Sequence, residues 1–136
     1  MRSVCRLVLV FLLALSGTAL ARDIHVATTA QLASAVADAR PGDRILLADG
    51  VYKVDAILHA RAAGTAAAPI IVAAMHRWQA RLLSTAVIAF EVTGAHWSFR
   101  DLDIRGVCPS DSDCEHAFHV VGADGFVLAG NRLVDF

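Results

Sequence analysis

The sequence lacks the features that mark several common protein classes. Its 12 Lys and Arg residues are matched by 13 Asp and Glu residues, for a formal net charge of -1, so no excess of positive charge indicates a nucleic-acid binder. After residue 21, no apolar run approaches the ~18 residues that a membrane-spanning helix requires, which excludes a polytopic membrane protein. Intrinsic disorder is also excluded for most of the chain, because 57% of the residues are hydrophobic.

Familiar catalytic and metal-binding motifs are scarce as well. No GxSxG motif is present, and no Ser stands near a His in a pattern typical of a nucleophilic triad. Asp111, Asp113 and Glu115 alternate acidic side chains, but the EF-hand pattern fails because His116 stands where that loop requires glycine. We therefore interpret this segment as a solvated acidic loop.

The first 21 residues have the three parts of a secretory signal peptide. Arg2 and Arg6 give a basic start, and residues 7–15 form an unbroken apolar run. Residues 19–21 (Ala-Leu-Ala) make a small-x-small cleavage site. An uncleaved membrane anchor is the alternative, but the apolar run is short for it. We expect a secreted or periplasmic protein made of residues 22–136, free of the membrane after cleavage.

Three cysteines are present, and Cys5 lies within the signal peptide. Export would bring the other two, Cys108 and Cys114, into an oxidising compartment. They predict a disulfide that closes a short loop and contributes about 2 to 3 kcal/mol at most. A zinc site that adds His116 and His119 is the alternative, but residues three apart on a strand point to opposite faces. We therefore predict the disulfide and no metal.

The segment after the signal peptide predicts a short strand and then a helix over residues 29–40. Thr28 and Gln31 fit a capping box, and residues 40–43 (Arg-Pro-Gly-Asp) end the helix. The apolar residues that recur at helical spacing are Leu32, Ala35, Val36 and Ala39. Beyond Pro41 only short β-type runs follow. These runs are 45–47, 51–54, 57–58, 70–72, 87–92, 97–99, 118–121 and 126–128.

An internal repeat is the strongest structural signal. Residues 88–94 read I-x-F-x-V-x-G, and residues 116–122 read H-x-F-x-V-x-G. Residues 97–104 (W-x-F-x-x-L-x-I) recur in residues 126–133 (F-x-L-x-x-N-x-L). Each half alternates with period two, so one face is apolar, and the phase slips by one residue at Asp101 and at the matching point of the second copy. A corner repeated at a fixed spacing is typical of a coil.

These patterns predict an all-β fold, a right-handed parallel β-helix with an N-terminal capping α-helix. Asn131 would occupy a corner, where it tolerates the bend and hydrogen-bonds the backbone of the neighbouring turn. A small antiparallel sandwich is the alternative, and the capping helix and the phase slips argue against it. The predicted inward residues are Phe90, Val92, Phe99, Leu102 and Ile104, stacked on Phe118, Val120, Leu128, Asn131 and Leu133.

The order of these segments resembles the N-terminal part of pectate-lyase-like β-helix proteins, and it is most similar to their chondroitinase B and alginate lyase branch. The resemblance covers nearly all of residues 23–136 and is more specific for the fold than for the substrate. The sequence segments that carry the resemblance are TTAQLASAVADARPGD, RILLADGVYKV, GTAAAPIIV, HWSFRDLDIRGV and CEHAFHVVGADGFVLAGNRLVDF.

The resemblance implies a relation to polysaccharide lyases, which act on uronic-acid polymers by β-elimination. In those lyases Ca²⁺ neutralises the uronate carboxylate, a Lys removes the neighbouring proton and an Arg assists the leaving oxygen. Those residues belong to middle turns of longer proteins, so none carries over, and no catalytic residue is assigned. We expect no cofactor in this chain, with Ca²⁺ confined to a full-length homologue. The length of such proteins also indicates that this chain is a cap and first turns, truncated before the catalytic turns.

Three residues are candidates for contact with an acidic polysaccharide. Trp78 follows no clean pattern and is the best candidate for an exposed aromatic contact. Glu115 and His119 share an outward phase and can touch a sugar. The alternatives to a lyase are a non-catalytic glycan-binding or structural β-helix module and an inactive truncated product. No nucleic-acid partner is expected, and the sequence does not set the oligomeric state.

Overall fold

The computed structural model describes residues 20–136. The predicted signal peptide and Cys5 lie outside this range, apart from Leu20 and Ala21, so the export signal stays a prediction. Within the described range, no helix is both long and apolar enough to cross a membrane.

The strands form three sheets, in which every neighbouring pair is parallel. Sheet A has the order β1 (Asp23–Val26), β2 (Arg44–Leu47), β5 (Ile70–Ala74), β8 (Trp97–Arg100) and β11 (Val127–Ala129). Sheet B has the order β3 (Gly50–Val54), β6 (Ala80–Ser84), β9 (Asp103–Gly106) and β12 (Arg132–Val134). Sheet C has the order β4 (Leu58–Ala60), β7 (Ile88–Val92) and β10 (His116–Val120).

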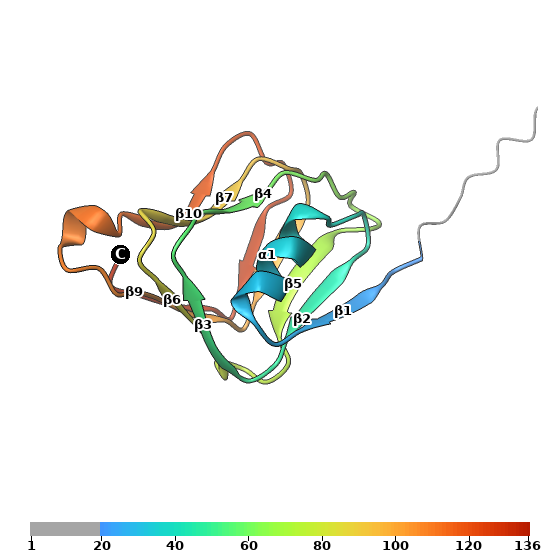
Figure 1. The fold of residues 1–136 in the computed structure, drawn as a ribbon. Helices are drawn as coiled ribbons and strands as arrows, with labels where there is room; N and C mark the ends of the chain where they lie inside the picture. Colours follow the sequence, from blue (N-terminus) through green and yellow to red (C-terminus); the bar gives the residue numbers. More distant parts are fainter. Residues whose placement is uncertain (1–19) are drawn as a thin grey trace, which may run out of the picture.

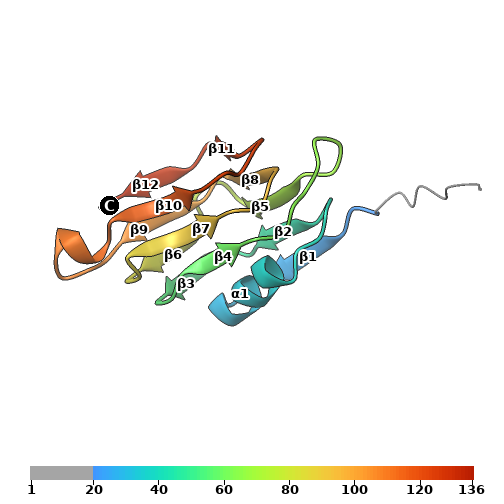
Figure 2. The same cartoon turned by 90° about the horizontal axis from the view of Figure 1, so that it is seen from above.

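Each turn of the chain adds one strand to each sheet. The first turn is β2, β3 and β4, the next two are β5 to β7 and β8 to β10, and β11 and β12 lie beyond them. The strands of successive turns overlie one another on three sides of the coil in Figure 1, and they form parallel layers in Figure 2. The fold is therefore the predicted parallel β-helix, with about 3 turns.

The predicted repeat corresponds to two neighbouring turns. The register of β10 on β7 pairs His116 with Ile88, Phe118 with Phe90 and Val120 with Val92. In the second half of the repeat, the paired residues are Leu128 with Phe99 and Leu133 with Ile104. Residues with the same place in the sequence pattern thus stack directly on one another.

The predicted phase slips are corners between sheet A and sheet B. Asp101, between β8 and β9, has a φ of 57°, and Gly130 has a φ of 67° at the matching place between β11 and β12. This left-handed backbone favours Gly and is tolerated by Asp and Asn. Asn131 Oδ1 accepts a hydrogen bond from Leu102 N (3.0 Å), and Asn131 Nδ2 donates one to Phe99 O (2.8 Å). The predicted bridge from Asn131 to the neighbouring turn is confirmed.

Aromatic rings fill the interior of the coil. The ring centroid of Phe90 lies 4.9 Å from that of Phe99 and 5.3 Å from that of Phe118, and Trp97 lies 5.9 Å from Phe99. Phe90, Trp97 and Phe99 are fully buried, as expected from their period-two spacing. Because Trp97 Nε1 donates a hydrogen bond to Ala62 O (2.7 Å), its one polar atom is satisfied.

The helix α1 (Thr29–Ala37) covers the end of the coil formed by the first strands (Figure 2). Thr28 Oγ1 accepts a hydrogen bond from Gln31 N, so the predicted N-cap is present. The return bond of the predicted capping box is shifted by one residue, because Gln31 Oε1 accepts from Ala27 N and not from Thr28 N. Leu32 and Val36 face the coil and are buried. The helix thus closes the apolar interior at this end.

The helix ends at Ala37, three residues before the predicted limit. Pro41 disfavours helical backbone at Arg40, and Asp43 N donates instead to Arg40 O in a turn. The structure also contains a strand that the sequence pattern did not predict, β6. Its buried positions include Ala80 and Ser84, which are too small or too polar to give a clear apolar alternation.

The two remaining cysteines form a disulfide in the structure. Cys108 and Cys114 lie in the connection between β9 and β10, with their Cα atoms 5.7 Å apart. A short 3-10 helix, η1 (Asp111–Asp113), lies between them, and the loop projects from the side of the coil (Figure 1). The insertion therefore leaves the stacking of the sheets undisturbed.

Candidate functional site

The structure places the three predicted sugar contacts in different parts of the coil. Trp78 lies at the corner between sheets A and B, between β5 and β6. His119 lies on β10 of sheet C, and Glu115 directly precedes that strand. Trp78 is half-buried, whereas Glu115 and His119 are exposed. Glu115 and His119 thus belong to one side of the molecule, at opposite ends of β10, and Trp78 belongs to a separate surface.

Backbone groups of the two following turns hold Trp78 in place. Its φ is 63°, which is unusual for a bulky residue, and its backbone N donates to Asp101 O (2.7 Å). The indole Nε1 donates to Gly130 O (2.7 Å). Trp78, Asp101 and Gly130 occupy the same corner in successive turns, so the strained backbone of Trp78 is fixed by the stacked turns beside it.

Two guanidinium groups lie against the indole ring. The Cζ atom of Arg77 is 4.3 Å from the ring centroid of Trp78, and that of Arg132 is 4.4 Å away. Both distances are within the range of a cation–π interaction. Arg77 Nε also lies 3.5 Å from Asp101 Oδ1. The two guanidinium groups therefore cover the aromatic surface, and a ligand that reaches this corner meets cations first.

The outer face of sheet B continues the positive charge of this corner. The register places Arg81 of β6, Asp103 of β9 and Arg132 of β12 side by side. Asp103 is only 1% exposed and accepts hydrogen bonds from Arg105 Nε and Nη2, each 3.0 Å long. These bonds and the charge of Asp103 raise the pKa of Arg105. The next row runs Lys53, Leu83, Arg105 and Val134, so the cations of this face outnumber its one acid but alternate with apolar side chains.

The outer face of sheet C has a different composition. The register aligns His59 of β4, Glu91 of β7 and His119 of β10. His59 Nδ1 is 3.6 Å from Glu91 Oε1, and the rings of His116 and His119 are 6.2 Å apart. Among residues 20–136, no group of three His, Cys, Asp or Glu residues is arranged to hold a metal ion. The disulfide also engages both cysteines of the alternative zinc site.

A pocket of about 380 Å³ lies beside β10, at the last turn. Glu115 and His116 provide its polar atoms near the loop, and Phe118, Leu128 and Phe136 contribute apolar surface. The predicted contact Glu115 thus borders a hollow, whereas His119 lies outside its lining.

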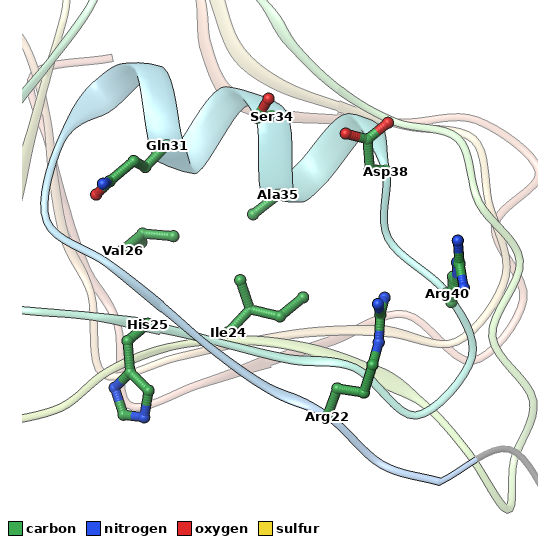
Figure 3. Close-up of a pocket in the computed structure, with 9 residues that line it drawn as sticks. All are labelled: Arg22, Ile24, His25, Val26, Gln31, Ser34, Ala35, Asp38 and Arg40. Carbon is green, nitrogen blue, oxygen red and sulfur yellow. The ribbon is translucent and has the colours of Figure 1, made fainter.

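A second pocket, of about 580 Å³, lies between β1 and α1 (Figure 3). Ile24 and Ala35 face each other across it, and Arg22 and Arg40 stand at one end. Its lining brings together no acid–base pair that would indicate catalysis.

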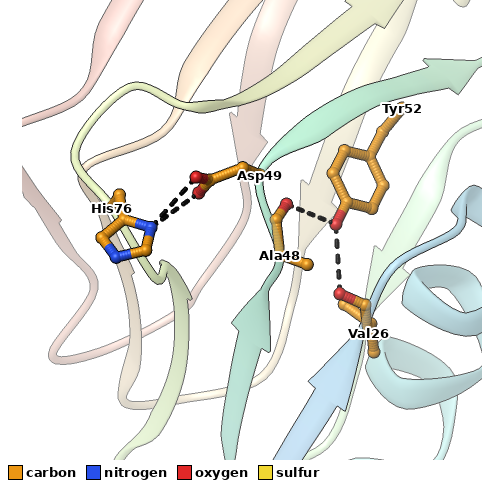
Figure 4. A network of polar contacts seen from close by, with 5 residues as sticks. All are labelled: Val26, Ala48, Asp49, Tyr52 and His76. Atoms are coloured by element: carbon orange, nitrogen blue, oxygen red, sulfur yellow. Dashed lines mark hydrogen bonds and ion pairs between the residues drawn. The ribbon is translucent and has the colours of Figure 1, made fainter.

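A polar network near the first corner serves the fold (Figure 4). The hydroxyl of Tyr52 lies 2.8 Å from Ala48 O and 3.1 Å from Val26 O, and its one proton is shared between these two carbonyl acceptors. Burial, and secondarily the charge of Asp49, raise the pKa of Tyr52, so it stays a neutral donor. His76 Nδ1 lies 2.9 Å from Asp49 Oδ1 on the surface. Tyr52 therefore joins β3 to β1 and the preceding corner.

Three parallel sheets wound by one strand per turn define the class of this protein as a parallel β-helix. The sequence profile of the family Chondroitinase B matches residues 26–117, and the chain belongs to this family. It is thereby related to polysaccharide lyases.

Solved structures agree with this assignment. An alginate lyase from Paenibacillus sp. str. FPU-7 is 27% identical, with a TM-score of 0.67 over 82% of this chain and 36% of that chain. The PL6 family alginate lyase AlyGC is 24% identical, with a TM-score of 0.52 over 66% of this chain and 12% of that chain, and it shows the shared fold. The chain thus spans well under half the length of these structures. No curated protein sequence matches it significantly.

Proposed function

We propose that this chain supplies the capped end and first turns of an exported polysaccharide lyase that cleaves uronic-acid polymers by β-elimination. The match to the chondroitinase B family over residues 26–117 carries the proposal, and the 27% identity to an alginate lyase supports it. In this reaction the negative charge of the uronate carboxylate is neutralised, a base removes the adjacent proton and the glycosidic oxygen leaves. Cleavage therefore produces an unsaturated uronate.

Glu115, His119 and Trp78 are the proposed substrate contacts of this chain. Their positions support contacts with two parts of a bound polymer, since Trp78 and the other two residues belong to separate surfaces. The chain is proposed to act outside the cytoplasm, as its signal peptide predicts. Ca²⁺ is proposed only for longer relatives.

The test is to incubate the purified full-length protein, with the turns that follow these first ones, with alginate and with chondroitin-type polymers and to follow the ultraviolet absorbance of unsaturated uronate. We expect the absorbance to rise with at least one of them and not with a neutral polysaccharide. If no uronate polymer gives unsaturated ends, the lyase proposal is wrong. Binding of these polymers without cleavage would favour a glycan-binding module.

A further inference from the structure

We propose that the outer face of sheet B and its corner at Trp78 form a binding surface for the carboxylate groups of an acidic polysaccharide. This inference rests on the proposed function, because it takes the substrate class from there. We name this surface the sheet B cationic face. It consists of Lys53, Arg77, Trp78, Arg81, Arg105 and Arg132.

The cations of this face are arranged in rows that cross the turns. Arg81 and Arg132 lie in one row, on either side of Asp103, and Lys53 and Arg105 lie in the next, on either side of Leu83. Neighbouring strands of a sheet are about 4.8 Å apart, so Arg81 and Arg132 are separated by about twice that distance along the row. An extended polymer that bears one carboxylate per sugar can therefore meet several cations when it lies across the strands.

The carboxylates of the face orient the cations without neutralising them all. Asp103 and Asp101 are the two acids that contact these arginines. Asp103 is buried beneath the guanidinium groups, so it offers little charge to solvent. Arg105 uses two of its five N–H donors on Asp103, and the rest stay available. The side chains of Arg77 and Arg132 are 61% and 44% exposed, which leaves them open to a ligand.

The Trp78 corner gathers two of these cations around one aromatic ring. Trp78 takes the left-handed corner position that Asp101 and Gly130 take in the next two turns. The guanidinium groups of Arg77 and Arg132 lie over its ring, so the indole holds both cations together at the surface. Sheet C offers no such combination, because its aligned outer residues are His59, Glu91 and His119.

The experiment measures the Kd of alginate oligosaccharides for the purified full chain and for the double variant Arg77→Gln/Arg132→Gln. The matched control is Arg44→Gln/Arg61→Gln, which removes the same charge from exposed positions on other parts of the coil. We expect the first variant to weaken binding by about 10-fold or more and the control to stay within about 2-fold of wild type. Higher salt should weaken wild-type binding, and a neutral polysaccharide should not bind.

A second variant distinguishes the loss of a cation from a folding defect at the Trp78 corner. Arg81→Gln changes one exposed residue, the second of β6, and should weaken binding by a smaller factor, with an unchanged far-ultraviolet circular dichroism spectrum. The inference is overturned if wild type does not bind alginate, or if folded R77Q/R132Q and R81Q both bind like wild type.

The same substitutions are also made in the full-length protein that carries the further turns, and its assay for unsaturated uronate separates the two proposals. Product formation with Kd values unchanged in the variants overturns the cationic face and leaves the lyase proposal standing. Binding through the face without product on any uronate polymer overturns the lyase proposal and leaves the cationic face standing.

Discussion

Counted by the sequence repeat, β7 to β9 form the middle turn of the coil and β10 to β12 form the last turn. The two turns carry the same inward pattern but have very different surroundings. Phe99 and Ile104 of the middle turn are 0% exposed, whereas their register partners Leu128 and Leu133 are 42% and 45% exposed. Apolar alternation therefore determines which way a side chain points, and the neighbouring turns determine whether it is buried.

The opposite end of the coil supports the same conclusion. There α1 takes the place of a neighbouring turn, and Leu32 and Val36 pack over the interior. As a result, Ile45 and Leu47 of the first turn are fully buried although no complete turn precedes them. A helix and a turn of the coil thus cover the apolar interior equally well.

The largest difference between the middle and last turns is expected when the same Phe-to-Ala substitution is made in each. Phe90→Ala removes a fully buried ring between Phe99 and Phe118, and we expect it to lower the free energy of unfolding by about 3–5 kcal/mol. Phe118→Ala, at the paired position of the last turn, should cost clearly less because that ring is only half-buried. Urea unfolding of both variants, followed by circular dichroism, measures the difference. Equal losses would contradict the role assigned to the neighbouring turns.

A smaller effect is expected where the last turn is joined to the middle one. Asn131→Ala removes the hydrogen bonds to Leu102 N and Phe99 O, and we expect a loss of about 2 kcal/mol in the same unfolding experiment. Asn131→Asp keeps the acceptor for Leu102 N and loses the donor, so its stability should be intermediate. If Asn131→Ala unfolds like wild type, the bridge does not hold the last turn.

The smallest effect is expected at the capped end and depends on pH. Hydrogen bonds from the Arg22 guanidinium, and then from Arg40 N, hold the pKa of Asp43 below its ordinary value despite burial. A lowered folded-state pKa stabilises the protein above the ordinary Asp pKa of about 3.9, and this stabilisation is lost as the pH falls through the folded-state pKa.

Asp43→Asn should therefore lower the urea midpoint at pH 7 by less than Asn131→Ala does, since Arg22 is partly exposed. The difference from wild type should shrink as the pH is lowered below about 4. The exposed pair Arg44–Asp23 provides the control, and Asp23→Asn should change the midpoint little at either pH. A gap between D43N and wild type that does not change with pH would contradict the assignment to ionised Asp43.

Much of the fold could be predicted because its signals are local or recur at a fixed spacing. Thr28 and Gln31 lie three residues apart, and the predicted N-cap bond between them is present. The slip at Asp101 is a property of consecutive residues, and its recurrence at Gly130 revealed the turn length. By contrast, β6 was missed because the buried positions Ala80 and Ser84 weaken its apolar pattern.

The surroundings of the candidate contacts could be predicted to a lesser extent. Trp78 drew attention because it fitted no pattern, yet its ring contacts Arg132 and its Nε1 bonds Gly130, which is 52 positions later. Such contacts depend on the combined length of two turns and their loops. The signal that points to them is the shared corner position of Trp78, Asp101 and Gly130.

The sequence by itself determined the inward face, the corners and the capping helix, because each depends on the φ preference or the periodicity of a few consecutive residues. Only the tertiary structure decided which inward residues are buried, which cations share a face with Asp103, and that Trp78 and His119 lie on different surfaces. The physical reason is that stacking brings together side chains one or more turns apart in the chain. Burial and charge then depend on register across the turns, which no single segment contains.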